Sequence, residues 1–162
     1  MARFLLKAKR STYASGAKGQ TLLRGGQQFY FQDGILSYWD TFYGFDPFIG
    51  QELVWSHDQG LVWAMNYYGG LIHDLIHDNF DAPRASPDKT YEFLKKALLA
   101  SDIKAPFRGP KHFSDGQWLQ WVYENDCSTV NGIGEFYGTE DISYKSLVVY
   151  RCNYHGGFVK EK

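Results

Sequence analysis

The segment Phe48–Gly70, FIGQELVWSHDQGLVWAMNYYGG, carries the two signatures around which the chain is organised. Both signatures return in Phe136–Gly157, FYGTEDISYKSLVVYRCNYHGG, because each segment begins F-x-G-x-E and ends N-Y-x-G-G. The two segments differ in length by one residue, at a position where a turn is expected. The recurrence predicts a chain built from two similar, strand-rich halves.

The residues around the first segment alternate between apolar and polar, as expected of β-strands that bury one face. Asp33-Gly34 separates two such runs and predicts a two-residue type I′ hairpin with positive φ at both positions. Asp58-Gln59-Gly60 predicts the next turn. The predicted strands are 27–32, 35–43, 48–57 and 61–68.

Residues 2–12 are predicted to form a short helix. Phe4, Leu5 and Ala8 share one helical face, and Lys9 lies largely off that face. A second helix is predicted from about residue 86 to residue 101. It opens with a serine at the N-cap and a proline at the first helical position.

These elements predict an α+β domain with an internal duplication. Each copy is one helix followed by about four antiparallel strands, over 2–70 and 88–157, with a connector at 71–87. Stacking the copies about a pseudo-twofold axis would bury both aromatic faces in one core. The pattern leaves open whether the strands form one long sheet, two packed sheets or a barrel. At 162 residues the chain is expected to be a single domain, 1–162.

Charge and composition narrow the classes of function. The net charge of −1 and the scattered basic residues give no basic surface for nucleic acid, so no direct binding to nucleic acid is expected. The N-terminus lacks the apolar core of about 7–15 residues that a secretory signal needs, and no run approaches a membrane span. A cytoplasmic protein is expected, with Cys127 and Cys152 interpreted as reduced and no cofactor.

The motifs FLLKAKRSTYASG, FIGQEL, VWAMNYYGG, FLKKAL and YHGG together resemble an uncharacterised bacterial domain family. That domain is often found at the C-terminus of transcriptional regulators, behind an Xre-type helix-turn-helix. The resemblance covers nearly the whole chain and implies a regulatory or sensing module, with no catalytic residues to carry over. No helix-turn-helix fits ahead of residue 2, so we expect a stand-alone member or a partner protein that supplies DNA binding.

Glu52 and Glu140 are the leading candidate site residues. Each shares strand parity with apolar residues, and a carboxylate on a core-facing parity is costly unless it is paired or hydrogen-bonded. One interpretation is a pair of acids in an aromatic pocket that binds a cationic or aromatic ligand. The other, slightly favoured, is that each glutamate accepts backbone or tyrosine hydroxyl hydrogen bonds at a sheet corner.

Aromatic and amide residues complete the candidate ligand-binding set. The asparagines of both N-Y-x-G-G signatures are interpreted either as strand-end turn residues or as donors at the pocket mouth. The two signatures differ at Tyr68 and His155, where a single ligand would be discriminated. Beside the two glutamates the set comprises Trp55, Trp63, Asn66, Tyr67, Tyr68, Asn153, Tyr154 and His155.

The sequence gives weaker evidence for a metal site or for catalytic residues. His73 and His77 have the i, i+4 spacing that two zinc ligands use on a helix, with Asp74, Asp78 or His57 as a third ligand, but a solvated connector is favoured and no metal site is predicted. No nucleophile elbow or phosphate-binding loop is present in the sequence. Asp40, Asp46 and Glu135 are candidate acid–base partners of Glu52.

The sequence is therefore compatible with three functions. The first is a small-molecule sensor domain with a pocket between the halves. The second is a protein–protein interaction or homodimerisation module, which would show an exposed aromatic patch around Tyr43–Phe48. The third is an enzyme with a carboxylate acid–base pair, which would show a glutamate with a titratable neighbour and a raised pKa.

Overall fold

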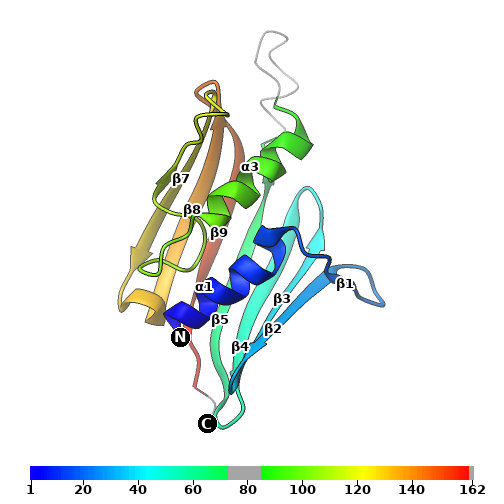
Figure 1. Ribbon diagram of the computed structural model, residues 1–162, viewed down its shortest axis with the longest axis vertical. Helices are drawn as coiled ribbons and strands as arrows, with labels where there is room; N and C mark the ends of the chain where they lie inside the picture. The colour runs from blue at the N-terminus through cyan, green and yellow to red at the C-terminus, as the bar shows by residue number, and fades with distance from the viewer. Residues whose placement is uncertain (73–84, 161–162) are drawn as a thin grey trace.

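The computed structural model describes residues 1–72 and 85–160, and within these residues the chain forms one antiparallel sheet of nine strands (Figure 1). The strand order is β1-β2-β3-β4-β5-β9-β8-β7-β6. The strands are β1 Gln20–Thr21, β2 Gln27–Asp33, β3 Leu36–Gly44, β4 Phe48–Ser56, β5 Gly60–Leu71, β6 His112–Phe113, β7 Trp121–Thr129, β8 Glu135–Tyr144 and β9 Leu147–Phe158.

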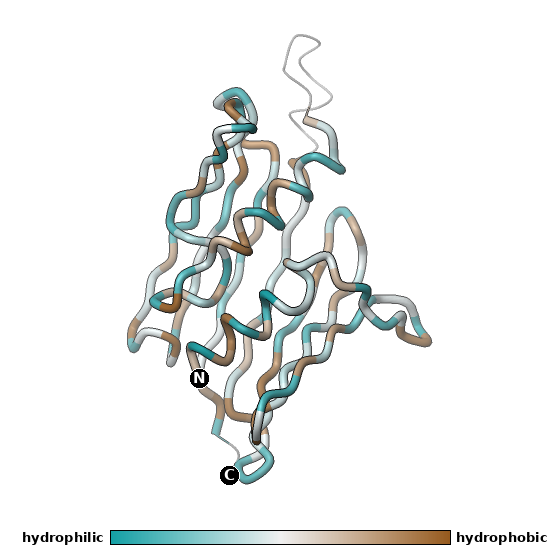
Figure 2. The backbone as a smooth tube through the Cα atoms, in the orientation of Figure 1, coloured by the Kyte–Doolittle hydropathy of each residue, from teal (hydrophilic) through white to brown (hydrophobic). Residues whose placement is uncertain are grey.

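Two helices lie side by side on one face of this sheet (Figure 1). Helix α1 spans Ala2–Ser11 and is followed by the 3₁₀ turn η1, Tyr13–Ser15; helix α3 spans Pro87–Leu99. A second 3₁₀ turn, η2, spans Gly132–Gly134. Hydrophobic and hydrophilic segments alternate along both helices, as expected of helices that bury one side (Figure 2).

The sheet has two unlike faces. The helix face, covered by α1 and α3, carries buried side chains such as Tyr38, Val54 and Trp63. The open face carries the residues of opposite parity, such as Tyr30, Tyr68 and Tyr137, which are more than half exposed. Because side chains alternate along each strand, one set of strands supplies both the core and this exposed surface.

The predicted fold class is wrong. Strands account for 49% of the described residues and helices for 20%, so this part of the chain is a single β-sheet with two short helices rather than a duplicated α+β fold of helix-plus-four-strand copies. The two series of strands do not stack on one another. They meet edge to edge where β5 pairs with β9, and the helices cover the apolar face instead of a second sheet.

The β5–β9 pair is the seam of the sheet, with a register that runs from Trp63 opposite Phe158 to Leu71 opposite Tyr150. The Gly-Gly pairs of the two signatures lie within these strands and not in the strand-end turns expected from the sequence. Gly156 is needed for close approach, since a Cβ there would lie 2.8 Å from Met65 Cα and closer still to the carbonyl oxygen of Ala64.

The hairpin turns also differ from expectation. At Asp33-Gly34 only Gly34 has a positive φ, +59°, and Asp33 still pairs with Leu36 as the last residue of β2. The two consecutive positive φ values of a type I′ turn occur instead at Lys145 and Ser146, between β8 and β9. Neither residue is a glycine or an asparagine, so the recurrence predicted a turn in this region but the residue types gave no signal for its positive φ values.

A methyl group at position 156 should force the two seam strands apart. We expect Gly156→Ala to lower the free energy of unfolding by about 1–3 kcal/mol, because overpacking against backbone is relieved only by moving the backbone. The matched control is Gly116→Ala, where a Cβ meets no atom within 4 Å. In thermal unfolding, Gly156→Ala should have a lower Tm than the parent, whereas Gly116→Ala should have the Tm of the parent. The same Tm for both variants would contradict the close packing at the seam.

Candidate functional site

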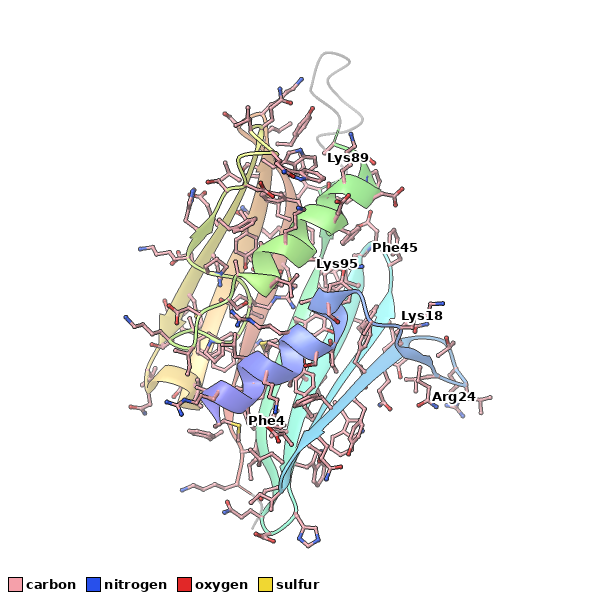
Figure 3. All side chains as sticks on the ribbon, in the orientation of Figure 1. Phe4, Lys18, Arg24, Phe45, Lys89 and Lys95 are labelled. Carbon is pink, nitrogen blue, oxygen red and sulfur yellow. The ribbon has the colours of Figure 1, made fainter. Side chains whose placement is uncertain are left out.

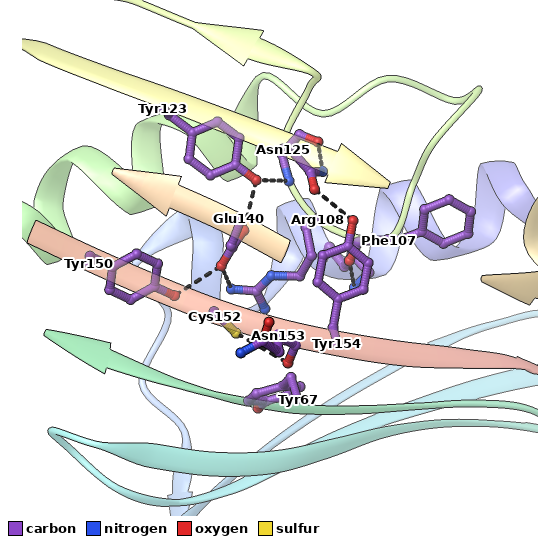
Figure 4. A network of polar contacts seen from close by, with 12 residues as sticks. Tyr67, Phe107, Arg108, Tyr123, Asn125, Glu140, Tyr150, Cys152, Asn153 and Tyr154 are labelled. Carbon is purple, nitrogen blue, oxygen red and sulfur yellow. Dashed lines mark hydrogen bonds and ion pairs between the residues drawn. The ribbon is translucent and has the colours of Figure 1, made fainter. Parts of the chain in front are cut away.

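The helix face contains a network of buried charges, and Glu140 on β8 is the centre of its first part (Figure 4). Glu140 Oε1 accepts a hydrogen bond of 2.5 Å from Arg108 Nη2 and one of 2.9 Å from the Tyr150 hydroxyl. Glu140 Oε2 accepts a third, of 2.7 Å, from the Tyr123 hydroxyl. The carboxylate is therefore both paired with a cation and hydrogen-bonded, as its complete burial requires.

Glu52 on β4 is the centre of the second part. Its Oε2 pairs with the Nζ of Lys9, which reaches down from α1. Lys9 Nζ also donates a hydrogen bond of 2.6 Å to the carbonyl oxygen of Phe107. Burial lowers the pKa of Lys9, although the adjacent Glu52 acts in the opposite direction. This contact joins three parts of the chain: α1, the sheet and the segment that carries Arg108.

A third buried carboxyl, Asp40 on β3, is paired differently. It lies opposite Glu52 in the β3–β4 register and is only 6% exposed. Within the described residues its carboxyl forms one hydrogen bond, accepted from the Tyr67 hydroxyl at 2.6 Å. No described cation forms a hydrogen bond with it. Burial and the neighbouring charge of Glu52 raise the pKa of Asp40 to about 7.

The residue in the matching register position beside Glu140 is neutral. Asn125 lies opposite Glu140 in the β7–β8 register. It accepts a hydrogen bond of 2.6 Å from the Tyr154 hydroxyl and donates one of 2.9 Å to the carbonyl oxygen of Gly109 (Figure 4). An amide therefore satisfies the same kind of tyrosine hydroxyl without a buried charge. An asparagine at position 40 could therefore accept the hydrogen bond of Tyr67, and the carboxyl of Asp40 is not needed for that contact.

Asp40 lines a cavity of about 180 Å³ between the helices and the sheet. Arg108 lines the same cavity and, like Asp40, is buried; Phe45 and Lys95, labelled in Figure 3, are the more exposed residues of its lining. Phe45 is 65% exposed, and Lys95 Nζ lies 5.2 Å from the centroid of the Tyr13 ring. Six aromatic side chains form the walls: Tyr13, Phe42, Phe45, Phe48, Tyr67 and Tyr91.

Arg108 is not fully satisfied by the chain. Its guanidinium lies 5.4 Å from the centroid of the Tyr67 ring, and its Nη2 binds Glu140. Its Nε is the one buried side-chain nitrogen or oxygen of the described residues that has no hydrogen-bond partner. A buried donor left unpaired costs about 1–3 kcal/mol. The cluster thus retains an unused donor beside the cavity that Asp40 lines.

The structure divides the candidate residues predicted from the sequence between the two faces of the sheet. Glu52 and Glu140 share the helix face with Trp63, Tyr67 and Tyr154. Of these only Tyr67 lines the helix-side cavity. The open face carries the others: Trp55, Asn66, Tyr68, Asn153 and His155. No single pocket brings all ten residues together.

Sequence reasoning missed the cations of the network. Lys9 was expected off the apolar face of its helix, and Arg108 lies in an irregular segment. The signal that pointed to partners was the core parity of Glu52 and Glu140, since a buried carboxylate is costly unless it is paired or hydrogen-bonded. The sequence suggested Asp40 only as an acid–base partner of Glu52. In the structure, Asp40 is itself a buried carboxyl with a raised pKa.

His73 and His77 lie outside the described residues. Within the described ranges, 1–72 and 85–160, no group of three or more His, Cys, Asp or Glu side chains could hold a metal ion. No helix in these ranges is long and apolar enough to span a bilayer. Both cysteines are free thiols, and burial raises the pKa of Cys152 to about 12.

The fold and the site define a small β-sheet protein with a charged cluster and an aromatic cavity beneath a layer of two helices. Residues 40–159 match a family described as a domain of unknown function, DUF5680, and the chain belongs to this family. The matched span includes Asp40, Glu52, Arg108 and Glu140 but begins after α1, which supplies Lys9. No curated protein and no solved structure matches the chain.

Neutralising Glu140 should leave Arg108 as an uncompensated buried charge. We expect Glu140→Gln to lower the free energy of unfolding by about 3–5 kcal/mol, which corresponds to a fall in Tm of roughly 10 °C. The control is the neighbouring Asp141→Asn, which breaks the pair between Asp141 and Arg151 at 2.8 Å on the open face. That partly exposed pair should contribute at most about 1 kcal/mol. Similar losses in the two variants would contradict the central role of Glu140.

The free energy of unfolding should depend on pH through the ionisation of Asp40. Asp40 ionises near pH 3.8 when unfolded but near pH 7 when folded, so its contribution falls as pH rises between these values. Asp40→Asn removes this loss and keeps an acceptor for Tyr67. We expect the variant to match the parent near pH 4 and to exceed it by about 4 kcal/mol at pH 8, which corresponds to roughly 8–16 °C in Tm. A difference that does not change with pH would contradict the assignment.

Proposed function

We propose that this domain binds a small aromatic amine in the helix-side cavity, with Asp40 as the counter-ion of the ammonium group. The observation that carries the proposal is the buried carboxyl of Asp40, which faces the cavity without a cationic hydrogen-bond partner among the described residues. A buried carboxyl whose pKa is far from its usual value, beside a cavity, is typical of a functional site.

The charges of the cluster favour a cation as the ligand. Lys9 is paired with Glu52 and Arg108 with Glu140, so these two cations and two carboxylates balance. Asp40 adds one further negative charge when it ionises. A ligand that supplies an ammonium group would compensate that charge, and it would do so in surroundings where charge–charge attraction is weakly screened. Glu52 and Glu140 have their cations already, so they support the cluster rather than contact the ligand.

The walls of the cavity favour an aromatic ligand of one ring. A cavity of about 150 Å³ takes a benzene molecule, and the helix-side cavity is slightly larger, at about 180 Å³. Phe42, Phe48 and Tyr91 offer ring faces and edges for stacking, while an ammonium group near the Tyr67 ring gains cation–π attraction. The exposed Phe45 and half-buried Lys95 form the entrance through which the ligand enters.

In its cellular role we propose a regulatory module that senses such an amine in the cytoplasm. The sequence motifs that resemble regulator-associated domains support this assignment, with DNA binding supplied by a partner protein. Ligand in the cavity would contact both the helix layer and the sheet, since Tyr13 and Tyr91 come from the first and Tyr67 from the second. The position of the helices is therefore the property that binding would change.

Binding should depend on the ionised form of Asp40. In isothermal titration with phenethylamine, we expect the association constant to rise about tenfold between pH 6 and pH 8, because bound ammonium favours the deprotonated carboxyl. Asp40→Asn should lower the association constant at pH 8 at least tenfold, even though the variant is more stable. The neutral analogue 2-phenylethanol should bind more weakly and without the pH dependence.

The control variant for this titration is Asp141→Asn, which removes a carboxylate from the open face and should leave binding unchanged. A parent protein that does not bind phenethylamine, tryptamine or benzylamine at millimolar concentration would refute the proposal. Equal binding by the parent and Asp40→Asn would refute the role of Asp40.

A further inference from the structure

The open face carries a second, separate groove of about 570 Å³, centred on the β5–β9 seam. It lies on the opposite side of the sheet from the helix-side cavity. Its volume falls within the range of about 300–1,000 Å³ that is usual for ligand sites. Neither α1 nor α3 lies on this face, and exposed side chains such as Asn66, Tyr68 and Tyr137 line the groove.

Two exposed tyrosines, together with Ile49 opposite Tyr68, provide the apolar contacts of this groove. Tyr68 on β5 is 55% exposed and Tyr137 on β8 is 62% exposed. Neither hydroxyl has a hydrogen-bond partner in the part of the chain that the structure describes. Each tyrosine therefore offers a ring face for stacking and a free hydroxyl at its end.

Two asparagines beside the tyrosines, Asn66 on β5 and Asn153 on β9, provide directed donors. Asn66 Oδ1 accepts a hydrogen bond of 2.8 Å from Gln51 Nε2, and Asn153 Oδ1 accepts one of 2.8 Å from Thr139 Oγ1. The acceptor ends are thus fixed by neighbouring side chains, which leaves both Nδ2 groups, with two N–H bonds each, facing the groove. Among described residues neither Nδ2 has an acceptor.

The charge of the groove restricts its ligand. No lysine or arginine lines it, and Asp126 is its one carboxylate. Phosphate-bearing ligands such as nucleic acid depend on basic side chains and would find none here. The groove combines ring faces, amide donors and hydroxyls, which is the complement of a neutral ligand rich in hydroxyl groups.

We propose that the groove binds a linear, neutral oligosaccharide, whose C–H faces stack on Tyr68 and Tyr137 and whose hydroxyl oxygens accept hydrogen bonds from Asn66 and Asn153. The strand register supports an extended ligand. Tyr68 is opposite Asn153, and Tyr137 is opposite His155, so the two rings are two strands and two residues apart. With strands about 4.8 Å apart and a rise of about 3.4 Å per residue, their Cα atoms are roughly 12 Å apart. A single sugar ring cannot reach both tyrosines.

The test is titration of the intact protein with maltohexaose, cellohexaose and chitohexaose, followed by the mono- and disaccharide of the hexasaccharide that binds. We expect millimolar or tighter binding of at least one hexasaccharide and at least tenfold weaker binding of its monosaccharide. Tyr68→Ala and Tyr137→Ala should each weaken binding at least tenfold. Tyr68→Phe and Tyr137→Phe, which retain the ring, should lose less than their alanine counterparts.

A control variant and an NMR readout separate this site from the rest of the molecule. Trp55→Ala removes a 37% exposed ring on the same face but outside the groove, and it should bind saccharide like the parent. In ¹H–¹⁵N spectra, saccharide should shift the side-chain amide signals of Asn66 and Asn153. This readout requires no variant to fold.

Three outcomes would overturn the proposal. One is that none of the three hexasaccharides binds; another is binding that Tyr68→Ala and Tyr137→Ala leave unchanged. The third is a stable dimer of the parent that both alanine variants convert to monomer, which would identify the groove as an interface between copies of the chain. Failure of amine binding in the helix-side cavity would leave this proposal standing.

Discussion

Two glutamates on the buried face of the sheet are each paired with a cation, and the pair formed by Lys9 and Glu52 ties α1 to the sheet. Glu52 is neutralised by Lys9 from α1, and Glu140 by Arg108 from the segment after α3. Apolar packing alone is tolerant of small displacements, whereas a buried charge without its partner costs several kcal/mol. We interpret the two pairs as the contacts that fix where the helices lie on the apolar face.

The same constraint explains why one carboxyl is available for a ligand. The two cations are used by the two glutamates, so Asp40 adds a charge that no described side chain neutralises by a hydrogen bond. Its neutral counterpart in the register, Asn125, satisfies a tyrosine hydroxyl equally well. Asp40 lines the aromatic cavity and is predicted to lower stability at neutral pH, and this combination is the basis of the proposed amine site.

Local structure was largely predictable because it depends on the spacing of residues close in sequence. The expected strand 48–57 is β4, Phe48–Ser56, and the expected helix at 86–101 is α3, which has Ser86 at its N-cap and Pro87 in its first turn. The recurrence predicted a turn between the last two strands, but not the positive φ values at Lys145 and Ser146, since neither residue type favours them. The site was half predictable: the core parity of Glu52 and Glu140 identified the cluster but not its cations.

By itself the sequence determined which residues alternate toward the core, where the helices begin, and that two glutamates must be buried with partners, because these properties follow from side-chain period and burial cost. Only the tertiary structure decided that β5 and β9 join edge to edge in one sheet, since backbone hydrogen bonds between strand edges are nearly independent of side-chain identity. That junction exposes one face and leaves the other to the helices. It places Lys9, Asp40 and Arg108, which are far apart in the sequence, around one buried cluster.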